Sequence, residues 1–212
     1  MKIPRLYPIV DKETLDRQGM RVGHFAAELA RAGVTVLQFR DKTGQPQDVL
    51  RCAAMISAAF AEKDCMLVMN DRADLAVLAG WSGVHVGHTD MSPCAARKVM
   101  VGHNDSGAWV GVSTHNPEQV AAAEAGCADY VAIGPVFATG TKRNAEPVVG
   151  LEGVRRARAL TTKPLVAIGG ITLENARSVI DAGADSVAVI GGLFVKGERP
   201  GKVAEDFLEL LR

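Results

Sequence analysis

Short runs of apolar, often β-branched residues alternate along this chain with longer, alanine-rich stretches of helical character. The strand-like runs are apolar throughout, which indicates burial on both faces, as parallel strands require. Regular alternation of strands and helices predicts a parallel sheet. We predict eight strands near 6–10, 35–39, 66–70, 84–87, 109–113, 130–134, 165–169 and 186–190, and eight helices near 20–31, 47–62, 72–79, 92–100, 117–125, 151–160, 172–182 and 201–211.

The number of these units favours a closed barrel. Eight βα units in 212 residues fit an α/β fold of the TIM type, a (β/α)8 barrel, and we expect a single domain over 1–212. A doubly wound, flavodoxin-like sheet is the alternative, but it would have to accommodate eight strands. An Ala-Gly pair ends four helical stretches, at Gly33, Gly80, Gly126 and Gly183, where a left-handed glycine can close a helix.

Composition limits the classes of binding partner and the cellular compartment that we expect. The net charge is zero and the pI is near 7.0, so no basic field predicts binding to nucleic acid or to an anionic membrane. The four cysteines, Cys52, Cys65, Cys94 and Cys127, have no C-x-x-C spacing, and we expect reduced thiols in a cytoplasmic protein. Neither a charged-then-apolar leader nor an apolar run of about 18 residues occurs, so we expect no membrane segment.

Two aspartates follow neighbouring predicted strands, Asp71 after the third and Asp90 after the fourth. The carboxyl ends of barrel strands hold the chemistry in this fold, so the two carboxylates can converge there. Hard oxygen ligands with room for water suit Mg2+. The alternative is that each aspartate caps the following helix, which Asp71 could do directly.

Cations gather at the same predicted end of the barrel. Arg40 and Lys42 follow the second strand, and Lys142 lies in a long loop, 134–151, after the sixth. The loop also carries Thr139 and Thr141 among glycines, and hydroxyls, N–H groups and an ammonium suit a phosphate. An ordinary surface loop with solvated charges is the alternative.

Two glycine pairs, Gly169-Gly170 and Gly191-Gly192, follow the seventh and eighth predicted strands. Barrels often bind phosphate at this place through backbone N–H groups. The sequence thus predicts two anionic subsites on one face, one with metal and cations and one with backbone amides. His85 lies within a strand, and we interpret it as a hydrogen-bonded core residue instead of a base.

Several motifs occur in a fixed order over nearly the whole chain, and together they are highly specific. With them the sequence resembles the thiamine phosphate synthase family. The motifs are Gln38-Phe39-Arg40-Asp41-Lys42, Asn70-Asp71-Arg72, Gly83 to Gly87 with Asp90, Gly111 to His115, Asp129-Tyr130-Val131, Gly134 to Phe137, Thr139 to Lys142, Ala167 to Ile171 and Ala182 to Asp185.

The resemblance implies a transferase that joins 4-amino-5-hydroxymethyl-2-methylpyrimidine pyrophosphate to a thiazole phosphate and releases pyrophosphate. It implies that Asp71 and Asp90 hold Mg2+ as the cofactor and that Lys142, Ser113 and Arg40 are catalytic. The pyrimidine pyrophosphate would contact Gln38, Arg40, Lys42, Asn70, Ser113 and Lys142, and the thiazole phosphate would contact Thr139, Thr141, Gly170, Ile190 and Gly191.

Departures from the family pattern are few. His88 replaces a usual Gln, Ala138 replaces a frequent Pro, and Gly191 stands where a Ser commonly contributes to the thiazole phosphate site. A related thiazole tautomerase branch, an isomerase, is the nearest alternative, but it carries a histidine where this chain has Pro135. A non-catalytic phosphate-binding protein on the same barrel is the third. Barrels of this kind often form homo-oligomers, and the sequence leaves the oligomeric state open.

Overall fold

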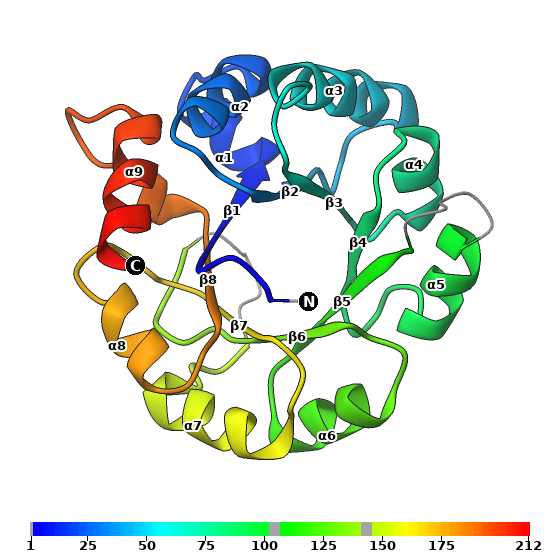
Figure 1. The fold of residues 1–212 in the computed structure, drawn as a ribbon, viewed down its shortest axis with the longest axis vertical. Helices are drawn as coiled ribbons and strands as arrows, with labels where there is room; N and C mark the ends of the chain where they lie inside the picture. Colours follow the sequence, from blue (N-terminus) through cyan, green and yellow to red (C-terminus); the bar gives the residue numbers. More distant parts are fainter. Residues whose placement is uncertain (1, 102–106, 141–145) are drawn as a thin grey trace.

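The computed structural model describes residues 2–101, 107–140 and 146–212. Within these ranges eight parallel strands close into a barrel in sequence order, and β1 pairs with both β2 and β8. Helices surround the barrel as an outer ring (Figure 1). The predicted (β/α)8 barrel is therefore confirmed, and the doubly wound alternative is excluded because the sheet has no open edge.

The strands are β1 (Leu6–Asp11), β2 (Val36–Arg40), β3 (Met66–Asn70), β4 (Gly83–Val86), β5 (Trp109–Thr114), β6 (Tyr130–Ile133), β7 (Leu165–Ile168) and β8 (Ser186–Val189). The helices are α1 (Lys12–Arg17), α2 (Val22–Arg31), α3 (Pro46–Ala59), α4 (Ala73–Leu78), α5 (Pro93–Val101), α6 (Pro117–Ala125), α7 (Gly150–Leu160), α8 (Ala176–Asp181) and α9 (Pro200–Leu210), with a 3-10 turn, η1 (Gly191–Leu193).

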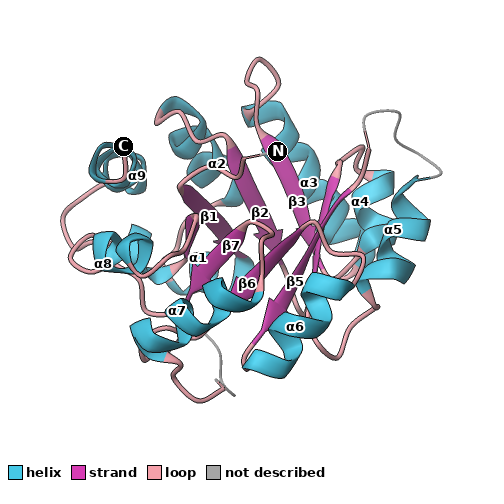
Figure 2. Cartoon of the chain, turned by 60° about the horizontal axis from the view of Figure 1, so that its bottom comes forward, coloured by secondary structure: helices cyan, strands magenta, loops and turns pink. Residues whose placement is uncertain are grey.

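The barrel has two apolar cores. Every second strand residue points inward, and this inner set includes Tyr7, Val68, Tyr130 and Val166, closed off by Ile3 near the amino ends of the strands. The alternate residues pack outward against the helices and form the larger core. Helices cover the outer side of the tilted strands throughout the view of Figure 2. Both faces of each strand are buried, which explains the uninterrupted apolar runs in the sequence.

Local details differ from the sequence prediction. Helix α8 begins at Ala176, later than the predicted start near 172. Helix α1 was not predicted: Asp11 begins it by accepting the N–H of Thr14 at 3.1 Å, a side-chain cap that compensates for its short length. The predicted glycine ends are correct at Gly33, Gly80 and Gly183, where φ is positive. The prediction is wrong at Gly126, which has φ −94°.

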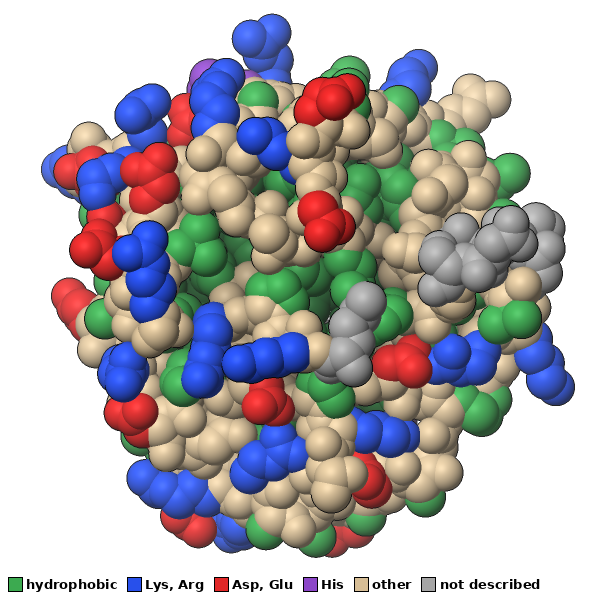
Figure 3. Space-filling model, in the orientation of Figure 1, with side chains coloured by type: hydrophobic (Ala, Val, Ile, Leu, Met, Phe, Trp, Pro, Cys, Tyr) green, Lys and Arg blue, Asp and Glu red, His purple; other side chains and the backbone are tan. Residues whose placement is uncertain are grey.

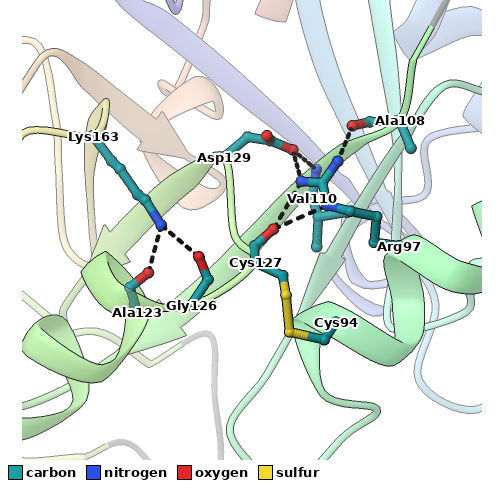
Figure 4. Close-up of polar contacts among 9 residues, drawn as sticks. All are labelled: Cys94, Arg97, Ala108, Val110, Ala123, Gly126, Cys127, Asp129 and Lys163. Carbon is teal, nitrogen blue, oxygen red and sulfur yellow. Dashed lines mark hydrogen bonds and ion pairs between the residues drawn. A yellow bond between two sulfur atoms is a disulfide. The ribbon is translucent and has the colours of Figure 1, made fainter.

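The conformation at Gly126 follows from the contacts of the turn between α6 and β6. Lys163 Nζ donates to the carbonyl of Gly126 at 2.9 Å (Figure 4). Arg97 of α5 donates to the carbonyl of Cys127 at 2.7 Å and pairs with Asp129 at 2.5 Å. In a helix end closed by a left-handed glycine, backbone N–H groups bond the last carbonyl groups. Here the side chains of Lys163 and Arg97 bond carbonyl groups of this turn instead.

The expectation of four reduced thiols is wrong for one pair. Cys94, at the start of α5, and Cys127, in the turn before β6, form a disulfide with their Cα atoms 5.0 Å apart (Figure 4). Cys52 and Cys65 are free. The bonded cysteines are 33 positions apart in sequence, and only the packing of α5 against this turn brings them together.

Positive and negative side chains are mixed on one face of the molecule (Figure 3). On the face shown in Figure 3, Lys and Arg side chains lie interspersed with Asp and Glu side chains around an apolar centre. Interspersed charges of this kind produce no extended field of one sign. Among the described residues, every helix is too short or too polar to span a bilayer.

Removal of the disulfide tests its contribution to stability. We expect Cys94→Ser to lower the free energy of unfolding by about 3–4 kcal/mol, because the bond closes a long loop and restricts the unfolded chain. Urea denaturation of the oxidised protein measures this loss. Cys52→Ser, which removes a free thiol, is the matched control. Equal midpoints for Cys94→Ser and the unsubstituted protein would contradict the expectation.

Candidate active site

A cavity of about 790 Å3 opens at the carboxyl ends of the strands. All the predicted site residues within the described ranges line this cavity. They come from six strand ends and from the loop after β6, and they are Gln38, Arg40, Lys42, Asn70, Asp71, Asp90, Ser113, Thr139, Gly170, Ile190 and Gly191. Two predicted residues, Thr141 and Lys142, lie outside the described residues.

Asp71 and Asp90 converge on one ammonium group. Lys42 Nζ forms an ion pair with Asp71 and lies 3.8 Å from Asp90 Oδ2. Asp90 Oδ2 also accepts the N–H of Gly87 at 3.0 Å, which fixes the carboxylate at the end of β4. The two acids and one base therefore form a compact charged cluster at the rim of the cavity.

The capping alternative for Asp71 is not supported by the geometry. Arg72, not Asp71, is the N-cap of α4, and no side chain caps this helix. Asp71 has φ +65°, which is rare for a residue with a side chain, and its N–H donates to the carbonyl of His85 at 2.7 Å. This backbone turns the carboxylate toward Lys42 and into the cavity.

The electrostatics of the cluster favour an added cation. Burial raises the pKa of Asp71, Lys42 opposes this shift, and the neighbouring Asp90 carboxyl raises the pKa further. Two carboxylates with one half-exposed ammonium leave the cluster short of positive charge. Paired carboxylate oxygens beside an open cavity are the ligands that Mg2+ prefers, so these residues fit the metal that the sequence resemblance implies.

Arg40 is held in place by an acid that sequence reasoning missed. Its guanidinium forms an ion pair with Asp11, whose side chain is only 1% exposed. Asp11 and Arg40 are direct partners in the register of β1 and β2, and the same carboxylate caps α1. Asp11 is the last residue of the first strand, and this position at the rim is the signal that could have identified it.

Asn70 presents an unused hydrogen-bond donor. Its Nδ2 atom is buried and has no partner among the described residues, although the side chain lines the cavity. Burial of an unsatisfied amide is costly, and such groups in a cleft commonly meet a ligand. Asn70 is therefore placed to donate to a bound molecule.

The glycine pairs allow three chain segments to meet. A Cβ atom on Gly170 would lie 2.6 Å from the carbonyl oxygen of Ala138, and one on Gly192 would lie 2.3 Å from that of Ile171. The N–H of Phe137 donates to the carbonyl of Gly169 at 3.0 Å, so the start of the long loop runs along the end of β7. Only glycine permits this close approach.

One further side chain holds the glycine segment in shape. Asn175 donates from Nδ2 to the carbonyl of Gly170 at 3.0 Å and accepts the N–H of Thr172 at 2.9 Å. Gly191 begins the 3-10 turn η1, where the first N–H groups have no partner within the turn. The backbone here offers donors to an anion, across the cavity from the acidic cluster.

The cavity is also lined by a polar group of inward-facing side chains that the sequence did not predict. Tyr7, Tyr130 and His85 form hydrogen bonds with one another and with Gln38 and Ser113. The interpretation of His85 as a hydrogen-bonded core residue is confirmed, since it is 7% exposed. The tyrosines give only a weak sequence signal, because inward-facing strand positions are normally apolar.

Comparison with known proteins agrees with this geometry. A family model described as thiamine monophosphate synthase matches residues 6–193. A thiamine-phosphate synthase of Koribacter versatilis is 52% identical over 100% of this chain and 97% of its own length. One from Methanoculleus marisnigri is 39% identical over 91% of this chain and 89% of its own.

A solved structure supports the same relationship. The thiamine phosphate pyrophosphorylase of Pyrococcus furiosus is similar with a TM-score of 0.82 and 29% identity, covering 98% of this chain and 95% of that chain. The sequence match and the structural match both extend over nearly all of the barrel. On this evidence the chain belongs to the thiamine monophosphate synthase family.

Proposed function

We propose that this protein is a transferase that condenses 4-amino-5-hydroxymethyl-2-methylpyrimidine pyrophosphate with a thiazole phosphate, giving thiamine phosphate and pyrophosphate. The observation that carries the proposal is that two unlike groups face one cavity, a carboxylate cluster that fits Mg2+ and a glycine-rich backbone that fits a phosphate. The first is the cluster of Asp71, Asp90 and Lys42, and the second is the glycine backbone at Gly170 and Gly191. Membership in the family supports the same reaction.

The pyrophosphate of the first substrate binds at the acidic cluster. Asp71 and Asp90 would hold Mg2+, which would supply positive charge next to the pyrophosphate leaving group. Lys42 and Arg40 add cationic charge, and Asn70 and Ser113 donate hydrogen bonds. Lys142, in the loop after β6, is assigned a catalytic role, in which its ammonium adds positive charge next to the pyrophosphate.

The second substrate binds across the cavity. Thr139, Thr141 and the backbone at Gly170, Ile190 and Gly191 hold its phosphate. Gly191 has no hydroxyl to offer, so its N–H group makes this contact. The phosphate anchors the thiazole with its ring nitrogen directed at the pyrimidine methylene carbon.

The reaction then needs little acid–base chemistry. As the C–O bond to pyrophosphate breaks, the cations of Arg40, Lys42 and Lys142 stabilise the negative charge on the leaving group. The aminopyrimidine delocalises the positive charge left on its methylene carbon. The lone pair of the thiazole nitrogen forms the new C–N bond, so no general base is required for this step.

A direct synthesis assay tests this proposal. Purified protein with Mg2+ and both substrates is expected to produce thiamine phosphate and pyrophosphate in equal amounts, measured by chromatography of the products. Omission of either substrate is the control. If thiazole phosphate is isomerised and no thiamine phosphate forms, the tautomerase function replaces the synthase. If neither reaction occurs while phosphate ligands bind, the protein is a binding protein.

The metal assignment is tested at Asp90. We expect Asp90→Asn to shift the Mg2+ concentration needed for half-maximal activity upward by about tenfold, because a charged oxygen ligand becomes neutral. Asp74→Asn is the matched control, since Asp74 pairs with Arg72 on the exposed side of α4. An unchanged Mg2+ titration for Asp90→Asn would remove Asp90 from the ligand set.

The cytoplasmic location is part of this proposal. Both substrates are phosphate esters that do not cross membranes unaided, so the enzyme acts in the compartment where they are made. Cell fractionation is expected to recover the protein together with soluble cytosolic markers. Recovery in a membrane or extracytoplasmic fraction would contradict a cytoplasmic location.

A further inference from the structure

Five inward-facing side chains form one continuous series of hydrogen bonds across the barrel. Gln38 Nε2 donates to the hydroxyl of Tyr7 at 3.2 Å, and the hydroxyls of Tyr7 and Tyr130 lie 2.8 Å apart. Tyr130 lies 3.0 Å from His85 Nδ1, and His85 Nε2 lies 2.9 Å from Ser113 Oγ. The series joins β2, β1, β6, β4 and β5, and we call it the tyrosine relay.

The barrel is built to accommodate this relay. Tyr7 and Tyr130 are each 1% exposed and lie edge to face, with ring centroids 6.0 Å apart. A Cβ atom on Gly111, which pairs with Tyr130 in the register of β5 and β6, would lie 2.0 Å from the phenol ring. Gly111 is therefore required for the ring of Tyr130 to reach the barrel axis.

Both phenols keep their protons. Burial raises the pKa of Tyr7 to about 12 and raises that of Tyr130 well above its ordinary value. Each hydroxyl therefore has one proton to donate and lone pairs to accept. In a buried site an unused donor is costly, so the relay is expected to run in one consistent direction.

The direction follows from Gln38. Because Tyr7 accepts from the amide nitrogen of Gln38, its own proton goes to the hydroxyl of Tyr130. Tyr130 then donates to His85 Nδ1, which places the ring proton on Nε2 and directs it at Ser113 Oγ. Ser113 accepts this bond, and its own proton is available to the cavity. At the other end, the amide oxygen of Gln38 is available as an acceptor.

We propose that Tyr7, Tyr130 and His85 are positioning residues that fix these two ends of the relay. The amide oxygen of Gln38 is thereby held where it accepts a hydrogen bond from the 4-amino group of the pyrimidine. The hydroxyl of Ser113 is held where it donates a hydrogen bond to the pyrophosphate. The relay makes the protein select an aminopyrimidine over its 4-oxo counterpart, which presents an acceptor at that position. This inference rests on the proposed function, because it takes its substrate from there.

The preference for the aminopyrimidine over its 4-oxo counterpart shows whether the tyrosines position Gln38 or only stabilise the fold. In Tyr130→Phe the relay is interrupted and the Gln38 amide can rotate. We expect the KM for the aminopyrimidine pyrophosphate to rise about tenfold, as for loss of one buried hydrogen bond. The KM for thiazole phosphate stays unchanged. The inhibition constant of the 4-oxo analogue is expected to fall relative to the KM of the aminopyrimidine substrate.

Trp109→Phe is the matched control. Its ring packs 5.7 Å from that of Tyr130 but takes no part in the relay, so this variant is expected to keep the selectivity. Tyr7→Phe is the second variant, used also if Tyr130→Phe does not fold. The double variant Tyr7→Phe/Tyr130→Phe is expected to lose no more selectivity than either single variant, because both interrupt the same series.

The outcomes separate this inference from the proposed function. If the unsubstituted protein makes no thiamine phosphate, the proposed function fails. If it is active and both tyrosine variants keep the full preference for the aminopyrimidine, the relay has no positioning role and the inference is overturned. Additive losses from the two tyrosines would overturn it as well, because they would indicate two independent packing effects.

Discussion

Closure of eight parallel strands into a barrel is the constraint on which the rest of this structure depends. Closure directs every second side chain of each strand into a narrow interior that must be filled. Here the interior is filled partly by apolar side chains and partly by two phenols and an imidazole, with Gly111 providing the space for Tyr130. The same closure brings all strand ends to one rim, where the cavity opens.

The folded barrel brings together, at its rim, two carboxylates that repel each other and that would lie apart in a disordered chain. Asp71 and Asp90 meet at Lys42, and Arg40 is held by the buried Asp11. Asp71 adopts positive φ to reach this position. Such backbone strain persists where the surrounding structure enforces it, and it is found mainly at functional sites. The rigid barrel thus supports an arrangement that fits the proposed metal and anionic substrate.

The tyrosine relay connects this rim to the barrel interior. Gln38 and Ser113 lie on strands that are not neighbours, and no direct contact joins them. In the proposed relay their polarity is coupled, because each phenol hydroxyl both accepts and donates while the His85 ring accepts at Nδ1 and donates at Nε2. A buried polar series of this kind specifies one arrangement of donors and acceptors, whereas an apolar filling would leave both side chains free to rotate.

The sequence by itself determined the barrel, because periodic burial and repeated βα units leave few other ways to bury these strands. It also placed Asp71, Asp90, Lys42 and the glycine pairs at the strand ends around the cavity, since strand ends can be recognised from local pattern. Only the tertiary structure revealed the partners of these groups, namely Asp11 for Arg40 and Tyr130 for His85. It also corrected the prediction for Cys94 and Cys127. These contacts join residues distant in sequence, and their geometry is set by closure and register, which no local pattern encodes.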